Sequence, residues 1–230
     1  MRVEPFGVDS FVHVVKRGAR GKHVTRDNLD RQRFVKLLFY LNDEHRSDFW
    51  EEDVRMLPPF KRPKHWPERR PLVKIVAWTL MPNHFHLLLQ EIQEGGVSRF
   101  MQSLCGSMSR HFNEKYDEHG SLFQGAYRSR TITTDRYLRW AISYVLVKNV
   151  FELYPGGYAR AVKEFDKAWR WGTETYLYSS LKEAARLEVS PIVDASLIRD
   201  VFRSAAEFKR CSRDMILGRQ GDSNEAVTFE

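Results

Sequence analysis

The stretch LVKIVAWTLMPNHFHLLLQ, residues 72–90, contains two apolar runs separated by the tripeptide MPN. Two such runs around a Pro-Asn break predict a hairpin of buried strands. The second run carries His84 and His86, one residue apart. Because strand side chains alternate between faces, both imidazoles point to one side, with Cβ atoms about 6.6 Å apart. That spacing suits a shared divalent ion, and it suits ordinary hydrogen bonding on a half-exposed sheet face equally well.

The segments on either side of this hairpin predict a regular order of strands and helices. The predicted strands cover residues 10–18 and 126–134, and the predicted helices cover residues 26–45, 97–116 and 136–150. Leu29 begins the apolar stripe of the first helix, and Asp135 is placed to cap the last one. The resulting β-α-β-β-α-β-α order predicts an α+β fold: a ferredoxin-like split βαβ sandwich, in which an antiparallel sheet carries its helices on one face.

Three segments lie outside this pattern. Residues 51–71 carry five prolines and several basic side chains, which predicts a basic loop or insertion. We expect the main domain to span residues 1–155. Residues 156–230 form a partly helical C-terminal extension, in which an ordinary packing helix is expected near residues 194–210, and the polar tail from about Gly218 is expected to be disordered.

The amino-acid composition indicates which class of partner the protein binds. The 37 Lys and Arg against 30 Asp and Glu give a net charge of +7, which favours polyanions such as nucleic acid. Cys105 and Cys211 are too far apart in sequence to indicate a disulfide framework. Neither a signal-type apolar core nor a run long enough to span a membrane is present, so we expect a cytoplasmic protein without a membrane partner.

Three motifs, taken in order, resemble a known family. The segments WTLMPNHFHLLLQ, HGSLFQGAYRS and DRYLRWAISYVLVKN, together with VHVVKRGARGKHV near the N-terminus, are similar to the REP-associated tyrosine transposases of the single-tyrosine HUH superfamily. The similarity covers roughly residues 8–155 and says little about residues 156–230. It implies a ferredoxin-like fold, a divalent metal such as Mg²⁺ or Mn²⁺ held by His84 and His86, and single-stranded or hairpin DNA as the partner.

The resemblance also assigns a nucleophile. Tyr144 matches the tyrosine that attacks DNA in that family, giving a 5′-phosphotyrosine link and a free 3′-hydroxyl. The residue pattern is compatible, because Tyr137, Ala141, Tyr144 and Lys148 share one stripe of a helix. A phenol ordinarily ionises near pH 10, so a nearby cation would help it. Without the resemblance, a tyrosine packing this helix onto the sheet explains the position as well.

The sequence departs from the family after this tyrosine. Related chains commonly continue Tyr-Ile-His-Leu-Asn-Pro, whereas this one reads Tyr-Val-Leu-Val-Lys-Asn. A protonated lysine cannot bind a metal, so Lys148 is expected to stabilise the phenolate or a phosphate instead. Asn149 is a further candidate ligand, although in a regular helix it lies about 140° round from Tyr144.

Other residues are candidates for contact with nucleic acid. Basic side chains take phosphates and an indole can stack on a base. We assign this role to Arg62, Lys64, Trp66, Gln124, Arg128 and Arg130. A solvated basic loop and a surface strand would present the same residues.

Three functions remain open at this stage. The leading hypothesis is a metal-dependent tyrosine DNA strand transferase acting on single-stranded, hairpin-forming repeats. The first alternative is a non-catalytic nucleic-acid-binding protein descended from a transposase, which Lys148 favours. The second is a metal-dependent hydrolase that activates water. The sequence leaves open whether a homodimer forms.

Overall fold

A computed structural model describes residues 6–218 of the chain. The strands are β1 (Phe11–Arg17), β2 (Val73–Leu80), β3 (His84–Glu91) and β4 (Arg128–Ile132). The helices before the last strand are η1 (Ala19–Gly21), α1 (Asn28–Tyr40), α2 (Trp50–Val54) and α3 (Gly96–Tyr116). Those after it are α4 (Asp135–Ser143), η2 (Tyr144–Lys148), α5 (Asn149–Glu152), α6 (Gly157–Lys163), α7 (Phe165–Glu174), α8 (Leu181–Arg186), α9 (Ala195–Val201) and α10 (Ala205–Ile216).

The four strands form one antiparallel sheet in the order β2-β3-β1-β4. Strands β2 and β3 form the predicted hairpin, and β1 inserts between β3 and β4. This order, with α1 and α3 as the two crossover helices, is that of the ferredoxin-like split βαβ fold. The fold prediction is therefore confirmed.

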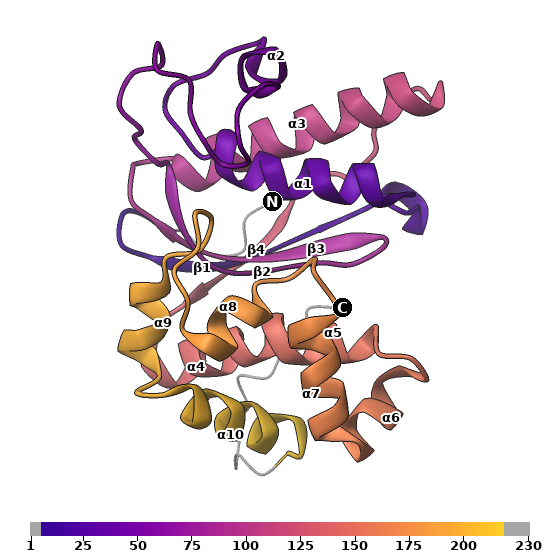
Figure 1. Ribbon diagram of the computed structural model, residues 1–230, viewed down its shortest axis with the longest axis vertical. Helices are drawn as coiled ribbons and strands as arrows, with labels where there is room; N and C mark the ends of the chain where they lie inside the picture. The colour runs from indigo at the N-terminus through magenta and orange to yellow at the C-terminus, as the bar shows by residue number, and fades with distance from the viewer. Residues whose placement is uncertain (1–5, 219–230) are drawn as a thin grey trace.

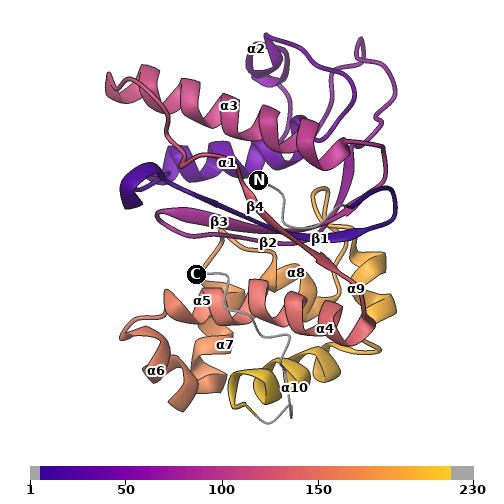
Figure 2. The same ribbon diagram turned by 180° about the vertical axis from the view of Figure 1, so that it is seen from behind.

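Helices cover both faces of the sheet (Figure 1). Helices α1 and α3 pack on one face, as the split βαβ order predicts. Helix α4 and the C-terminal helices pack on the other face, which Figure 2 shows from behind. The helical extension is thus a second layer over the sheet.

The extension is joined to the sheet by backbone hydrogen bonds to β2. Leu80 N–H donates to the carbonyl of Tyr178 at 2.9 Å, and Ser180 N–H donates to the carbonyl of Trp78 at 3.0 Å. Farther along β2, the N–H of Asp194 donates to the carbonyl of Ile75 at 3.0 Å. Because these bonds satisfy the outer edge of β2, the extension protects an otherwise exposed strand edge.

Two local predictions were wrong. Thr134, rather than Asp135, caps α4, because its hydroxyl accepts the N–H of Tyr137 at 3.2 Å. Leu29 is 65% exposed and lies off the core stripe of α1, whose buried side chains begin with Asp30 and Phe34. Helix α1 starts at a capping box between Asp27 and Asp30, which turns Leu29 outward.

A buried carboxylate links α1 to α3. The Asp30 side chain is fully buried and accepts hydrogen bonds from Lys115 Nζ at 2.8 Å, Tyr116 OH at 2.7 Å and His111 Nε2 at 3.2 Å. It also accepts the backbone N–H of Arg26 at 2.8 Å. Burial alone would raise the pKa of Asp30, but the hydrogen bonds outweigh it and hold the pKa well below its ordinary value.

We predict that Asp30→Asn lowers the free energy of unfolding by roughly 3 kcal/mol, because it removes the buried charge of the network and leaves Lys115 paired only with the exposed carboxylate of Asp27. Since the folded-state pKa lies below the unfolded value of about 3.9, the stabilisation is complete above that pH and is lost as the pH falls through the folded value. Urea denaturation at pH 7 and at pH 3 measures both effects. The matched control is Asp166→Asn, which removes an exposed carboxylate paired with Lys209 and Arg213 and should change stability little. Equal effects of the two substitutions would contradict a special role for Asp30.

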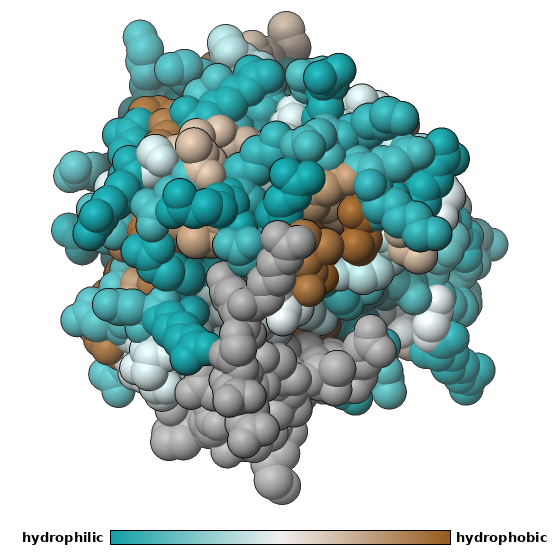
Figure 3. Space-filling view, turned by 90° about the horizontal axis from the view of Figure 1, so that it is seen from below, coloured by the Kyte–Doolittle hydropathy of each residue, from teal (hydrophilic) through white to brown (hydrophobic). Residues whose placement is uncertain are grey.

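Figure 3 shows a mainly hydrophilic surface on the side of the C-terminal helices, with smaller hydrophobic patches. Within residues 6–218, no helix is long and apolar enough to cross a membrane. The polar tail predicted from about Gly218 lies almost wholly outside the described residues.

Candidate active site

Strand β3 presents both histidines on the face covered by the C-terminal helices. Residues paired directly across an antiparallel sheet share a face. His86 is paired with Val15 on β1 and Thr79 on β2, and His84 is paired with Arg17 on β1. The imidazoles of His84 and His86 lie close together, with ring centroids 5.0 Å apart. The predicted same-side placement of the two rings is therefore what the fold produces.

Each histidine uses one ring nitrogen in a hydrogen bond to the protein. His84 Nδ1 donates to the side-chain oxygen of Asn83 at 2.7 Å, and His86 Nδ1 lies 3.0 Å from His13 Nε2. Burial, reinforced by Arg17 and Lys148, lowers the pKa of His84 to about 4. Burial is also the main cause that lowers the pKa of His86 well below its ordinary value. Both imidazoles are neutral near pH 7, which is the form that binds metals.

Tyr144 packs directly on this histidine cluster. Its ring lies edge-on to His86, with centroids 5.9 Å apart, and edge-on to His13 at the same distance. The indole of Trp140, one turn earlier on α4, stacks on the Tyr144 ring with the centroids 4.8 Å apart. Tyr144 is buried, and its orientation is set by rings on three elements, β1, β3 and α4. The fold therefore brings together the predicted nucleophile and the predicted metal ligands.

The helix carrying Tyr144 contains a π-helical turn, η2, over Tyr144–Lys148. The N–H of Asn149 donates to the carbonyl of Tyr144, five residues back, instead of to Val145 as in an α-helix. The released carbonyl of Val145 accepts the hydroxyl of Thr79 from β2 at 2.6 Å. A sheet side chain thus occupies the place of a helical hydrogen bond, which is a known cause of local helix distortion.

The wider turn changes the direction in which Asn149 faces. With hydrogen bonds spanning five residues, each residue turns through less than the 100° of an α-helix, so Asn149 lies nearer the face of Tyr144 than the regular-helix estimate indicates. Asn149 is buried, and its Nδ2 has no hydrogen-bond partner within the described residues. Its role as a ligand stays a prediction.

Lys148 lies beside the hydroxyl of Tyr144. Its Nζ is 3.4 Å from the Tyr144 oxygen and 4.9 Å from the centre of the ring, and it forms an ion pair with Glu152 at 2.5 Å. Burial lowers the pKa of Lys148, but the bond to Glu152 and the nearby Tyr144 oxygen outweigh burial and raise it overall. Lys148 is therefore a cation held next to the oxygen that would become a phenolate.

Two arginines of β4 lie on the same side of the sheet as the histidines, and Gln124 lies at the end of β1. Arg128 is paired with Val15, and Arg130 is paired with His13, so both β4 arginines share the histidine face. The loop after α3 lies along the end of β1, where Gln124 N–H donates to the carbonyl of Arg17 at 2.9 Å. Arg128 and Gln124 are exposed. Their contact with nucleic acid stays a prediction, and their positions suit it.

The basic loop lies elsewhere. Residues 51–71 sit beside α1 and α3, across the sheet from the histidines (Figure 1). Arg62 forms an ion pair with buried Asp43 at 2.6 Å, and Trp66 is only 8% exposed, with its Nε1 donating to Asp53 at 3.1 Å. Lys64 is exposed. Of these three candidates for contact with DNA, the structure thus leaves Lys64 most accessible and gives the other two structural contacts.

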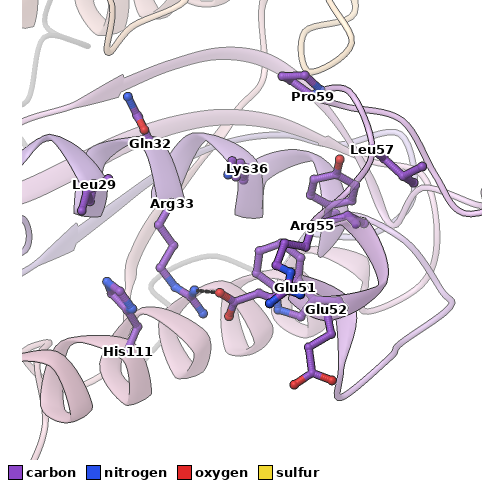
Figure 4. Close-up of a pocket in the computed structure, with 13 residues that line it drawn as sticks. Leu29, Gln32, Arg33, Lys36, Glu51, Glu52, Arg55, Leu57, Pro59 and His111 are labelled. Atoms are coloured by element: carbon purple, nitrogen blue, oxygen red, sulfur yellow. Dashed lines mark ion pairs between the residues drawn. The ribbon is translucent and has the colours of Figure 1, made fainter.

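A separate cleft opens between α1, α2 and α3 (Figure 4). The ion pair of Arg33 with Glu51, 2.5 Å long, joins α1 to α2 across it, and His111 of α3 lies at one end. This cleft is on the face away from His84 and His86. None of the residues predicted from the sequence to act on DNA lines it.

The two histidines fit a divalent metal in one respect and lack a complete ligand set in another. In each histidine Nδ1 forms a hydrogen bond to a neighbouring side chain, and Nε2 is the nitrogen that remains to bind a metal. Metal-binding histidines commonly adopt this arrangement. Within residues 6–218, however, no cluster of three or more His, Cys, Asp and Glu side chains could hold a metal. A metal here would need further ligands from Asn149, water or the oxygens of a bound DNA phosphate.

Three residues of this site were not predicted. They are His13, which contacts His86, Thr79, which donates to the Val145 carbonyl, and Glu152, which pairs with Lys148. The predicted split βαβ order places the strand of His13 beside β3, but the sequence did not give the register that makes His13 a diagonal neighbour of His86. Glu152 follows Lys148 by four residues, a spacing that does indicate a helical ion pair.

Comparison with known proteins supports the resemblance found in the sequence. Residues 68–146 match a family model described as "Transposase IS200 like". The matched segment is about one third of the 230-residue chain and includes His84, His86 and Tyr144. For this segment the resemblance to the IS200-like transposases is confirmed.

A solved structure of a REP-associated tyrosine transposase bound to a REP hairpin is similar to this chain. The TM-score is 0.45 and the sequence identity 14%, over 84% of this chain and 93% of the other. No curated protein matched the chain.

We predict that Arg62→Ala and Lys64→Ala have different effects. Arg62→Ala should lower the free energy of unfolding by about 1–3 kcal/mol, because it leaves the buried carboxylate of Asp43 without its charged partner. Lys64→Ala should leave stability unchanged. If Lys64 contacts a phosphate, its removal should reduce the salt dependence of single-stranded DNA binding by about 0.7 in the slope of log K against log salt. An unchanged slope would remove Lys64 from the interface.

Proposed function

We propose that this protein is a DNA strand transferase that nicks and rejoins single-stranded or hairpin DNA through Tyr144. The observation that carries the proposal is the position of the Tyr144 phenol, packed against His86 and 3.4 Å from the Lys148 ammonium. The family match over residues 68–146 supports it, because the matched segment includes the tyrosine and both histidines. The net charge of +7 supports a polyanionic substrate.

The proposed reaction exchanges one phosphoester for another. The Tyr144 oxygen attacks the phosphorus of a backbone phosphate, forming a 5′-phosphotyrosine bond as the bond to the 3′ oxygen breaks. The phenol loses one proton and the departing 3′ oxygen gains one, so no water or nucleotide is consumed. Attack by another 3′-hydroxyl on the phosphotyrosine reverses these steps and joins two strands.

His84 and His86 are the residues that would hold a divalent ion, such as Mg²⁺ or Mn²⁺, through their Nε2 atoms. When bound, the ion would supply positive charge to polarise the scissile phosphate. Lys148 acts on the nucleophile instead, because an ammonium next to the phenol oxygen favours the phenolate. Glu152 holds that ammonium in place at 2.5 Å.

The face around the histidines is suited to a DNA strand. Arg128 and Arg130 alternate along β4 on this face and would take successive phosphates, while Gln124 extends from the turn beside Arg17. We further propose that residues 1–155 hold the catalytic residues. The extension, residues 156–230, would then support them through residues 156–218, which cover the second face of the sheet.

Tyr144→Phe is expected to abolish covalent attachment to a single-stranded hairpin substrate. Folding and DNA binding should stay nearly intact, since the ring still packs between Trp140 and the histidines. The measurement is a denaturation-resistant protein–DNA adduct on a gel. The matched control is Tyr154→Phe, which removes the hydroxyl of a half-buried tyrosine that bonds to Glu164 and should keep the adduct.

Two outcomes would contradict the proposal. An adduct that persists in Tyr144→Phe would show that another residue attacks. If the wild-type protein binds hairpins but gives no adduct with Mg²⁺ or Mn²⁺, the protein is a DNA-binding descendant of a transposase.

Lys148→Met is expected to slow adduct formation by about 10²-fold at pH 7, because it removes a preorganised cation from the phenolate. The loss should be smaller near pH 10, where a phenol ionises unaided. Rates of adduct formation against pH measure this, with Lys163→Met, an exposed lysine of α6, as the control for net charge. A faster reaction in Lys148→Asn than in the wild type would instead show that Lys148 has displaced a metal ligand.

A further inference from the structure

His13 and His86 form a buried side-chain hydrogen bond between two strands of the sheet. Their ring nitrogens, His13 Nε2 and His86 Nδ1, lie 3.0 Å apart, and the rings stack at 26° with centroids separated by 5.2 Å. The two residues are diagonal neighbours on β1 and β3, because His13 is paired with Leu88 rather than with His86. His13 is 0% exposed and His86 is 3% exposed. A bond this well shielded from water contributes strongly to the orientation of both rings.

One proton occupies this bond, and its position decides what His86 can bind. If His86 Nδ1–H donates to His13, the Nε2 of His86 keeps its lone pair for a ligand. If His13 Nε2–H donates instead, His86 carries its own proton on Nε2 and cannot bind a metal through that atom.

The charged side chains near the two histidines favour one of these arrangements. His84 Nδ1 bonds to the side-chain oxygen of Asn83, and an amide oxygen can only accept, so His84 carries its proton on Nδ1. Arg17 and Lys148 act electrostatically on both histidines. A lone pair, rather than an N–H, is the favourable group to present to these cations. This electrostatic consideration favours a proton on Nδ1 and a lone pair on Nε2 of His86.

We propose that His13 is a positioning residue that accepts the Nδ1–H of His86 and thereby fixes His86 in the tautomer with an open Nε2. The inference rests on the proposed function in one respect, namely that His86 uses Nε2 to bind a divalent metal. Partners of this kind are worth about 10–100-fold in metal affinity in known sites. His13 itself touches neither metal nor DNA in this scheme.

The first test reads the tautomer in the metal-free wild-type protein. Long-range ¹H–¹⁵N correlation of the histidine rings distinguishes a proton on Nδ1 from one on Nε2. We expect His86 to carry its proton on Nδ1. A proton on Nε2 of His86 would overturn the proposal, and this readout depends on neither metal binding nor DNA cleavage.

The second test compares two variants by titration with Mn²⁺ alone. His13→Phe keeps a ring but offers no acceptor, and it should weaken Mn²⁺ binding about 10–100-fold and allow His86 to change tautomer. His13→Gln supplies a side-chain oxygen as acceptor and should recover most of the affinity. Equal Mn²⁺ affinity in wild type and His13→Phe would overturn the proposal, as would a failure of His13→Gln to bind better than His13→Phe. Should His13→Phe not fold, the wild-type tautomer and His13→Gln still decide.

The two proposals fail in distinguishable ways. Absence of Mn²⁺ binding by the wild-type protein would contradict the metal site of the proposed function, and the tautomer of His86 would still test its bond to His13. Absence of a DNA adduct would leave both His13 measurements unaffected.

Discussion

The antiparallel pairing of β1 with β3 is the constraint on which the candidate active site depends. It sets Arg17 opposite His84 and brings His13 diagonally beside His86, joining segments 73 residues apart in the chain. Side chains on a strand alternate with a period of two, so a slip of one residue would turn the imidazoles into the layer beneath α1 and α3. Buried apolar side chains on that other face, such as Val14 and Phe85, resist such a slip.

The second helical layer converts this polar row into a site. Helix α4 and the π-helical turn that follows it place Tyr144 against the histidines. The Thr79 hydroxyl donates to the carbonyl of Val145, which in an α-helix would accept the N–H of Asn149. The π-helical turn therefore couples the conformation of the helix to the sheet. Lys148 is the last residue of this turn, so the same coupling places its ammonium near the phenol oxygen of Tyr144. A substitution at Thr79 is therefore expected to change the position of Tyr144, the proposed nucleophile, although the two side chains do not share a role.

The two faces of the sheet divide stability from chemistry. On one side, Asp30 and Lys115 tie α1 to α3 through a buried network, and Arg62 holds the basic loop through Asp43. On the other side, neutral imidazoles and a cation next to a tyrosine create an environment suited to a phosphate and a developing phenolate. Some basic side chains therefore form structural ion pairs, and others lie on the histidine face. The net charge alone does not distinguish these two groups.

Local patterns in the sequence were enough to determine the order of strands and helices, the hairpin that carries His84 and His86, and the same-side placement of their rings, because these depend on periods of 2 and 3.6 residues. The motif order also pointed to Tyr144. Tertiary structure alone decided that His13 bonds to His86, that Thr79 opens a π-helical turn before Asn149, and that Trp66 is buried rather than free to stack. Each of these depends on contacts between segments far apart in the chain, which no local periodicity encodes. The extension shows the same limit: a partly helical segment with one packing helix was expected, but its position against β2 follows from an unpaired strand edge that only the assembled sheet presents.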